Sequence, residues 1–224
     1  MPSKPEPIKP EGRLGWMAVL PEGRAVTFFM EREERFEDLE QEQPEQWLLM
    51  RTSDDHGRTW SAARRTFAYP AGKGRVSAGL PLVDRDGQLH VFSLRFYKIG
   101  WRTQDWRDSH AALEHIVSRD GGQTWSAVQP IDYGHRYTGS YNCVLQMDNG
   151  RILFPLSFRA PERENGQFVS TVVYSDDGGA TWAKSNDLAV ESGGLYVESG
   201  AVEPVVVQFP SGLLWMVIRT QTGY

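Results

Sequence analysis

The chain has 224 residues, of which 40% are hydrophobic and 24% are charged, a balance that allows a buried core and excludes a mainly disordered protein. Its 22 glycines, 13 prolines and 12% aromatic residues favour an all-β protein of short strands and tight turns over a helical bundle. The formal net charge of −5 argues against nucleic-acid binding, because phosphate affinity comes from clustered Lys and Arg. No P-loop, G-x-G-x-x-G or H-E-x-x-H motif is present, so neither a cofactor nor a metal is expected.

The N-terminal segment, MPSKPEPIKPEGR, carries charges and prolines where a signal peptide needs an apolar stretch. No segment approaches the roughly 18 consecutive apolar residues of a membrane span. If Met1 is the natural start, we expect a cytoplasmic protein without a membrane partner.

Four segments further along the chain share a hairpin pattern, in which an apolar strand, a turn ending in glycine and a second apolar strand follow one another. The turn glycines are Gly23, Gly87, Gly150 and Gly212, and they lie 64, 63 and 62 positions apart. A period that regular predicts one supersecondary unit repeated in space.

A second motif, S-x-D-x-G-x-T-W, occurs after each of the first three hairpins, at residues 53–60, 118–125 and 175–182. Its aspartate can accept hydrogen bonds from its own turn, its glycine allows a positive φ, and its tryptophan can pack back between strands. Metal binding is disfavoured because the aspartates Asp55, Asp120 and Asp177 belong to different repeats and lack further oxygen ligands nearby.

This motif is the Asp-box, and together with the hairpins it makes the chain resemble the sialidase superfamily of BNR-repeat β-propellers, from about residue 12 to the end. The resemblance implies four-stranded antiparallel blades, six in the family, with the Asp-boxes on the side away from the active site. The chain would form one partial propeller domain over 1–224, and its missing partner would be the remaining C-terminal blades. The expected blades are 14–66, 76–130, 139–190 and the start of a fourth at 201–224.

The resemblance also implies arginines that bind a substrate carboxylate, beginning with Arg13, which stands nine residues before Glu22-Gly23 as the family's R-I-P arginine does. Leu14-Gly15 replaces the Ile-Pro of that motif. Arg32 ends the next strand, and Glu37 or Asp38 in the following loop would be the catalytic acid/base, with Asp38 preferred. Without the resemblance, the charge run over 31–46 indicates a solvated loop or a short helix.

The fourth hairpin has Glu203 at the start of its first strand and Arg219 at the end of its second, as in the sialidase pattern. Hairpin strands are antiparallel, so the two side chains should return to the same rim. The resemblance implies that Glu203 polarises a tyrosine nucleophile, and that this tyrosine and a third arginine belong to later blades. Charged residues at the strand ends of any propeller rim are the alternative interpretation.

The leading hypothesis is therefore a glycoside hydrolase resembling exo-α-sialidases, which would release terminal sialic acid from acidic glycans with retention. The alternative is a non-catalytic BNR propeller that binds glycans or a protein partner. Loss of Ile-Pro after Arg13 favours the alternative, whereas Glu203 with Arg219 favours the enzyme.

Two further segments leave their roles open. His110 and His115 in HAALEH are weak metal candidates that we expect on a helical or loop surface. Trp101 and Trp106 lie in an aromatic and basic insertion, which either stacks on a sugar or is a plain surface loop.

Overall fold

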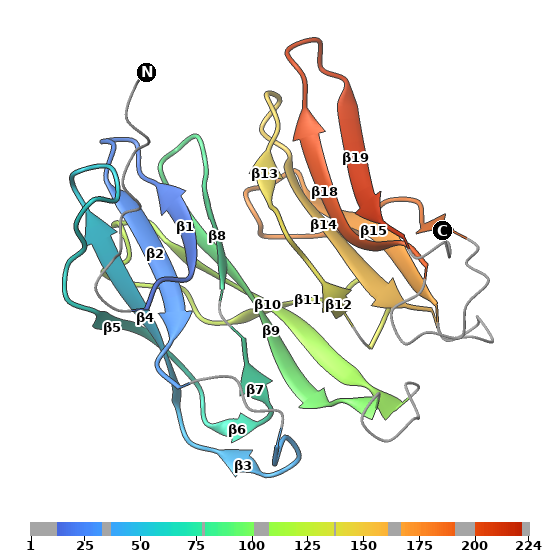
Figure 1. Cartoon of the computed structure of the whole chain (residues 1–224), viewed down its shortest axis with the longest axis horizontal. Coiled ribbons are helices and arrows are strands. Elements are labelled where there is room, and N and C mark those ends of the chain that lie inside the picture. Colours follow the sequence, from blue (N-terminus) through green and yellow to red (C-terminus); the bar gives the residue numbers. More distant parts are fainter. Residues whose placement is uncertain are drawn as a thin grey trace, which may run out of the picture.

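The computed structural model describes residues 13–32, 37–77, 79–100, 108–136, 138–160, 167–190 and 200–220. Nineteen strands form in this described part, arranged mainly in four antiparallel sheets, so the protein is all-β (Figure 1). In this described part, a helix with the length and apolarity of a membrane span is absent.

The first sheet has the strand order β1-β2-β4-β5, with every neighbouring pair antiparallel. Its strands are β1 (Trp16–Val19), β2 (Ala25–Met30), β4 (Gln46–Ser53) and β5 (Arg64–Tyr69).

The second sheet has the order β11-β10-β9-β7, and β8 pairs with the same edge of β9 as β7 does, nearer to the start of β9. Its strands are β7 (Arg75–Val76), β8 (Leu80–Val83), β9 (Leu89–Lys98), β10 (His110–Ser118) and β11 (Gln129–Ile131). A small sheet formed by β3 (Glu42–Gln43) and β6 (Gly72–Lys73) joins the first two sheets.

The third sheet is built around the antiparallel pair of β14 and β15. Its strands are β12 (Thr138–Ser140), β13 (Leu145–Gln146), β14 (Ile152–Arg159), β15 (Phe168–Ser175), β16 (Ala183–Lys184) and β17 (Leu188–Ala189). The fourth sheet is a single hairpin of β18 (Val202–Gln208) and β19 (Leu214–Arg219).

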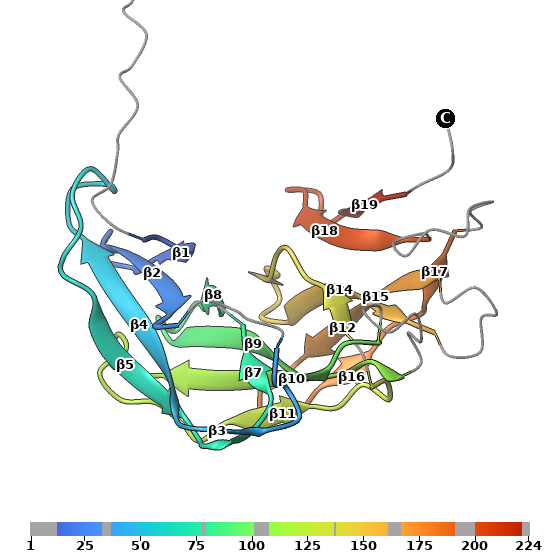
Figure 2. The same ribbon diagram turned by 60° about the horizontal axis from the view of Figure 1, so that its bottom comes forward.

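The sheets follow one another around an arc as the blades of an incomplete β-propeller (Figures 1 and 2). In each sheet the second strand, β2, β9, β14 or β19, runs in the same direction, toward the lower edge of Figure 1. The ends of these strands therefore share one rim of the arc. The Asp-box turns follow β4, β10 and β15, which are antiparallel to the second strands, so they lie on the opposite rim.

The hydrophobic core lies between neighbouring sheets. One cluster joins side chains of the first and second sheets, including Phe28, Met50, Val91 and Ile116, and a larger one joins the second and third sheets. All eight residues of β14 are buried, since both faces of the third sheet are covered around that strand. The fold is therefore held by contacts between blades more than by any single central core.

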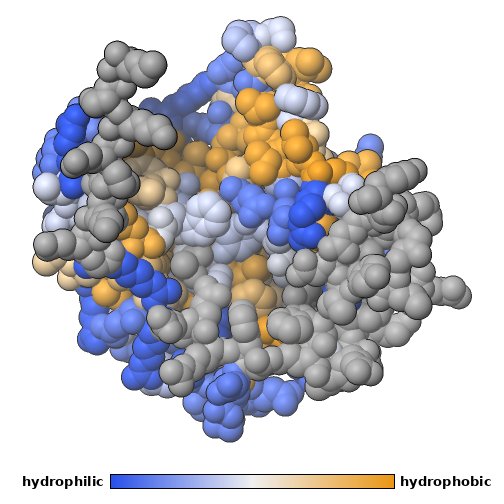
Figure 3. Space-filling view, viewed as in Figure 1, coloured by the Kyte–Doolittle hydropathy of each residue, from blue (hydrophilic) through white to orange (hydrophobic). Residues whose placement is uncertain are grey.

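The hairpin β18–β19 has one covered face and one open face. Val206 is buried on the side of the third sheet. The alternate residues Val205, Val207, Trp215 and Val217 pair across the hairpin and are 41%, 45%, 57% and 52% exposed. Figure 3 shows the resulting apolar surface in orange over this hairpin.

Candidate functional site

The rim formed by the ends of the second strands carries four of the residues that the sequence singles out. Arg13 lies three residues before β1, and Arg32 two residues after β2. Glu203 is the second residue of β18, and Arg219 is the last residue of β19. First strands begin where second strands end in an antiparallel hairpin, so all four positions belong to the same rim of the arc (Figure 1).

Glu203 and Arg219 form a two-bonded ion pair. Arg219 Nε donates to Glu203 Oε2 at 2.5 Å, and Arg219 Nη2 donates to Oε1 at 3.1 Å. These hydrogen bonds hold the pKa of the Glu203 carboxyl below its ordinary value, so this side chain stays ionised near neutral pH. Both side chains are a little over a third exposed, at 39% and 37%, which leaves the carboxylate open to a ligand.

The backbone of Glu203 is held in an unusual conformation by the neighbouring blade. A bulge lies between Val202 and Val205, and Glu203 has a φ of 54° in the left-handed region. Its N–H donates to Ser140 Oγ of β12 at 3.1 Å, and Ser140 Oγ lies 2.7 Å from Ser157 Oγ of β14. The third sheet thus sets the position of the carboxylate. Strained backbone conformations held by neighbouring structure cluster at functional sites.

Arg13 lies against the end of β2. Its Nη1 donates to the carbonyl oxygen of Met30 at 3.4 Å, and its guanidinium carbon lies 5.9 Å from the centre of the Phe29 ring. The side chain is exposed, so it can also reach a ligand at the rim.

Glu37 and Asp38 are exposed residues of the loop that leads into β3. Asp38 has a φ of 60°, its Oδ1 accepts from Gln41 Nε2 at 3.0 Å, and its carbonyl oxygen accepts from Gln43 Nε2 at 2.9 Å. Among the described residues, no contact joins either carboxylate to Arg32 or to the Glu203–Arg219 pair. The structure therefore places both carboxylates in the loop after β2 without bringing them into contact with the predicted arginines.

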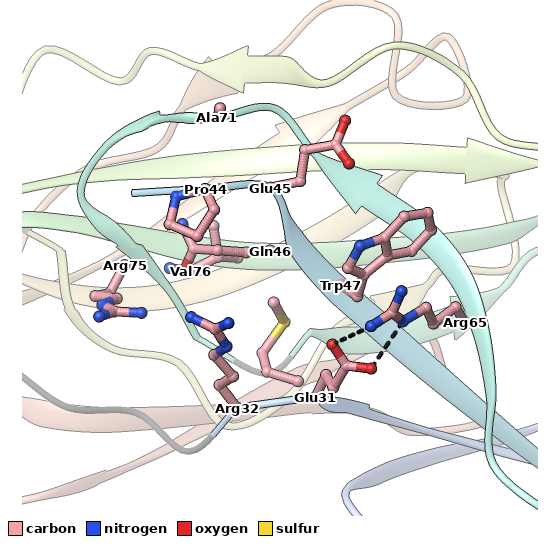
Figure 4. A pocket seen from close by; sticks show the side chains of 11 residues that line it. Glu31, Arg32, Pro44, Glu45, Gln46, Trp47, Arg65, Ala71, Arg75 and Val76 are labelled. Atoms are coloured by element: carbon pink, nitrogen blue, oxygen red, sulfur yellow. Dashed lines mark hydrogen bonds and ion pairs between the residues drawn. The ribbon is translucent and has the colours of Figure 1, made fainter. Parts of the chain in front are cut away.

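A pocket of about 470 Å³ lies beside Arg32, at the end of β2 (Figure 4). Glu31 pairs with Arg65 through two hydrogen bonds of 2.7 and 2.9 Å, and the Arg65 guanidinium carbon lies 5.0 Å from the Trp47 ring centre. Arg32, two residues after β2, and Arg75, in β7, project into the same space. The other lining residues are Met30, Pro44, Glu45, Gln46, Ala71 and Val76.

Sequence reasoning missed Arg75. The one feature of the sequence that could have indicated it is its position at the start of an inner strand of the second blade, which is equivalent to the position of Arg13 in the first blade. Trp101 and Trp106, the other predicted rim residues of this blade, lie outside the described residues.

The expectation that HAALEH forms a helical or loop surface is wrong. His110 and His115 belong to strand β10, and His115 is 1% exposed because it stacks on Phe92 and meets the edge of Trp182. The residues between the two histidines have a high helix propensity, but pairing with β9 holds them in a strand. In the described part of the chain, no group of three His, Cys, Asp or Glu side chains is arranged to hold a metal ion.

The Asp-box turns repeat the same contacts in all three blades. In the second, Asp120 Oδ1 accepts from Thr124 N at 2.8 Å, Oδ2 accepts from Thr124 Oγ1 at 2.6 Å, and Ser118 Oγ donates to Oδ1 at 2.8 Å. The threonine hydroxyl and the backbone N–H lower the pKa of this aspartate, like that of its two counterparts, to about 2. These carboxylates accept hydrogen bonds from their own turns, and they lie on the rim away from Glu203.

Comparison with known families agrees with this geometry. Residues 71–224 match the family model of the BNR repeat-like domain, and residues 51–62 match that of the BNR/Asp-box repeat. The chain belongs to the BNR repeat-like domain family. Its three Asp-box turns and the arc of antiparallel blades are those of a sialidase-like BNR propeller.

Known relatives of this BNR-repeat chain include two sialidases. The chain is 23% identical to the sialidase of Clostridium perfringens over 187 residues, which cover 77% of this chain and 47% of that protein. It is 22% identical to the sialidase of Paraclostridium sordellii over 153 residues, which cover 60% of this chain and 37% of that protein. This chain thus spans half or less of the length of the curated relatives it matches.

Solved structures share the fold of this BNR-repeat chain at low sequence identity. A mutant of the NanB sialidase from Streptococcus pneumoniae gives a TM-score of 0.63 at 15% identity, covering 94% of this chain and 48% of that one. The α-L-arabinanase of Penicillium chrysogenum gives 0.60 at 19% identity, covering 92% and 58%. A protein of unknown function from Dyadobacter fermentans gives 0.67 at 19% identity, covering 91% and 60%.

Proposed function

We propose that this chain forms part of a glycoside hydrolase that releases terminal sialic acid from glycoconjugates by a retaining mechanism. The observation that carries the proposal is the Glu203–Arg219 ion pair, on the same rim as Arg13 and Arg32. Similarity to two sialidases supports it, and so does a fold shared with sialidase and arabinanase structures.

In this proposal, Arg13, Arg32 and Arg219 bind the substrate carboxylate. Guanidinium groups suit this task because they stay charged and can donate two parallel hydrogen bonds to one carboxylate. Arg13 and Arg32 are exposed at the end of β2, and Arg219 is half-buried at the end of β19, so the cationic groups face a ligand from two blades.

Asp38 is the proposed general acid, with Glu37 as the neighbouring alternative. The carboxylic acid gives its proton to the glycosidic oxygen, the aglycon leaves as an alcohol, and the resulting carboxylate then takes a proton from the incoming water. The exposed side chain of Asp38 is accessible to a bound glycan.

Glu203 is the proposed partner of a tyrosine nucleophile. Its ionised carboxylate accepts the phenol proton while the phenol oxygen attacks the anomeric carbon. A neutral phenol suits this attack because the carbon bears a carboxylate that repels an anionic nucleophile. We propose that the tyrosine comes from the half of the propeller that the relatives have and this chain does not cover.

The test measures binding and hydrolysis separately. We expect the 224-residue chain to bind sialic acid saturably but to leave a fluorogenic sialoside intact, and a form extended to the length of its relatives to hydrolyse it. In the extended form, Asp38→Asn and Glu203→Gln should each lower kcat by about 10²-fold or more, because a proton donor or a site charge is lost. Arg58→Met, in an Asp-box turn, is the control and should leave kcat unchanged.

Clear turnover by the 224-residue chain would contradict the proposed origin of the nucleophile. Saturable binding without turnover in either form would contradict the enzyme and support the non-catalytic glycan-binding propeller.

A further inference from the structure

One position on the Asp-box rim, at the upper edge of Figure 1, departs from the repeat. In the first blade, the residue after the turn glycine, Arg24, donates to Asp54 of the Asp-box at 2.7 Å. In the third blade, the equivalent residues Arg151 and Asp176 form two hydrogen bonds of 2.6 and 2.9 Å. Both blades therefore close this rim with an ion pair between an arginine and a carboxylate.

The second blade replaces both members of this pair. Gln88 stands where the other two blades have arginine, and Arg119 stands where they have aspartate. Arg119 Nε donates to Gln88 Oε1 at 3.1 Å, and this is the one hydrogen bond of Arg119 among the described residues. The Asp-box turn does not need this cation, because the other two turns form with an aspartate in its place. The exposed guanidinium of Arg119 is therefore available to a ligand.

Arg119 lies between two pockets of the same rim. One, of about 580 Å³, is formed with the hairpin turn of the first blade, and the other, of about 440 Å³, with the Asp-box turn of the third blade. Each volume falls within the roughly 300–1,000 Å³ of small-ligand sites. Since Arg119 lines both pockets, an extended ligand that binds it at its middle can occupy both, whereas a single small anion would occupy one.

The pocket beside the first blade contains a further arginine without a carboxylate partner. Arg64 Nη2 donates to the carbonyl oxygen of Gly122 at 2.9 Å, and in the described part of the chain Arg64 has no ion pair. Of the acidic residues that line this pocket, Asp120 accepts hydrogen bonds within its own turn, and Glu22 lies close enough to Arg24 to raise its pKa. The cations therefore remain open to an external carboxylate.

We propose that this rim binds an extended acidic segment of a partner protein, with Arg119 holding a carboxylate side chain of that segment. A guanidinium group donates two parallel hydrogen bonds to a carboxylate, and arginines recur in the recognition of acidic peptide motifs. Gln88 and Gln129 line the pocket beside the third blade, where their side-chain amides can bond to a peptide backbone. The surface lies on the rim away from Glu203, so the inference does not depend on the proposed hydrolase.

The experiment measures binding of a short labelled peptide, in which glutamate and glycine alternate, to the 224-residue chain by fluorescence anisotropy. We expect saturable binding, and none with a peptide that carries glutamine in place of glutamate. Gln88→Arg combined with Arg119→Asp rebuilds the ion pair of the other two blades, so it should fold and weaken binding by about tenfold or more. Arg58→Gln, which lowers the charge of the same rim by the same amount, is the matched control and should bind as the unchanged chain does.

Absence of saturable binding of the glutamate peptide would overturn the proposal, and equal binding of the glutamine peptide would overturn the acidic segment. A loss in Arg58→Gln equal to that in the double variant would overturn Arg119 as the site, since any charge on the rim would then serve. Sodium glutarate that binds as tightly as the peptide would overturn the protein partner and leave a site for free carboxylates. Thermal unfolding shows whether each variant is folded, and Arg119→Gln replaces the double variant if that variant is not.

Discussion

A row of buried polar side chains, Asp84, His90 and His115, crosses the second sheet. His90 Nε2 lies 3.1 Å from Asp84 Oδ2, and His90 Nδ1 lies 3.0 Å from His115 Nε2. The Nδ1 of His115 is buried without a partner, and burial lowers the pKa of His115 to about 3. Both histidines are therefore neutral in the folded protein at ordinary pH.

This burial predicts acid sensitivity. Between about pH 6.5 and pH 3 the unfolded chain binds a proton at His115 and the folded chain does not, so stability is present above pH 6.5 and falls as the pH decreases. The expected slope from this one group is about 1.4 kcal/mol per pH unit. In urea unfolding at several pH values, His115→Gln should lose stability less steeply than the unchanged chain below pH 6.5. Parallel pH dependences would contradict the assignment.

The tryptophan of the Asp-box turn links one blade to the blade before it. The ring of Trp125, which follows β10, lies 6.0 Å from that of Phe28 in β2 at nearly a right angle, and its Nε1 donates to Thr66 Oγ1 of β5 at 3.0 Å. Trp182 of the third blade makes the corresponding contact with Phe92 of the second. Each indole thus fixes a neighbouring pair of blades as well as its own turn.

Trp60, in the first blade, provides a matched comparison. Its Nε1 donates to Gly57 O within its own turn at 3.1 Å, and the sheet that holds it is the first in chain order among the described residues. We expect Trp125→Ala to lower the free energy of unfolding by about 3 kcal/mol, because it removes apolar contacts between two sheets. Trp60→Ala should cost about 1 kcal/mol or less. Denaturant unfolding measures both, and equal losses would contradict an interblade role for Trp125.

The arc of blades exposes apolar surface at both of its ends. Trp16, Met17 and Val19 of β1 are 40%, 57% and 62% exposed, and the open face of β18–β19 is comparably exposed. Contiguous apolar surface of this kind marks an interaction site in soluble proteins. We propose that further blades cover these faces in a closed propeller, which leaves fewer strand edges unpaired.

The uncovered hairpin predicts concentration-dependent self-association of the 224-residue chain. Charges on the open face should prevent it, so Val207→Lys combined with Trp215→Lys should shift sedimentation toward the monomer. Leu188→Lys, which changes an exposed side chain of β17 on another sheet, should not. A chain that sediments as a monomer at all concentrations would contradict this expectation.

The features that could be predicted from the sequence alone are those whose contacts are made between residues close together in the chain. The hydrogen bonds of each Asp-box turn lie within eight residues. Asp55, for example, accepts hydrogen bonds from Thr59 and Ser53. The motif therefore predicts the turn, and the repeated turn indicates the fold. Glu203 and Arg219 are 16 positions apart, and one hairpin register brings them together. The all-β class and the propeller architecture follow from repeating such units.

The features that depend on how separate sheets pack could not be predicted from the sequence. Arg32, just after β2, and Arg75, in β7, line one pocket because these two segments belong to adjacent blades, and no local motif around either residue indicates that they meet. His115 is buried because β10 pairs with β9 and the third sheet covers it, although its own sequence favours an exposed helix. Local patterns fix hydrogen bonding within a hairpin or turn, whereas burial and the meeting of side chains from different blades depend on contacts between sheets that are remote in sequence.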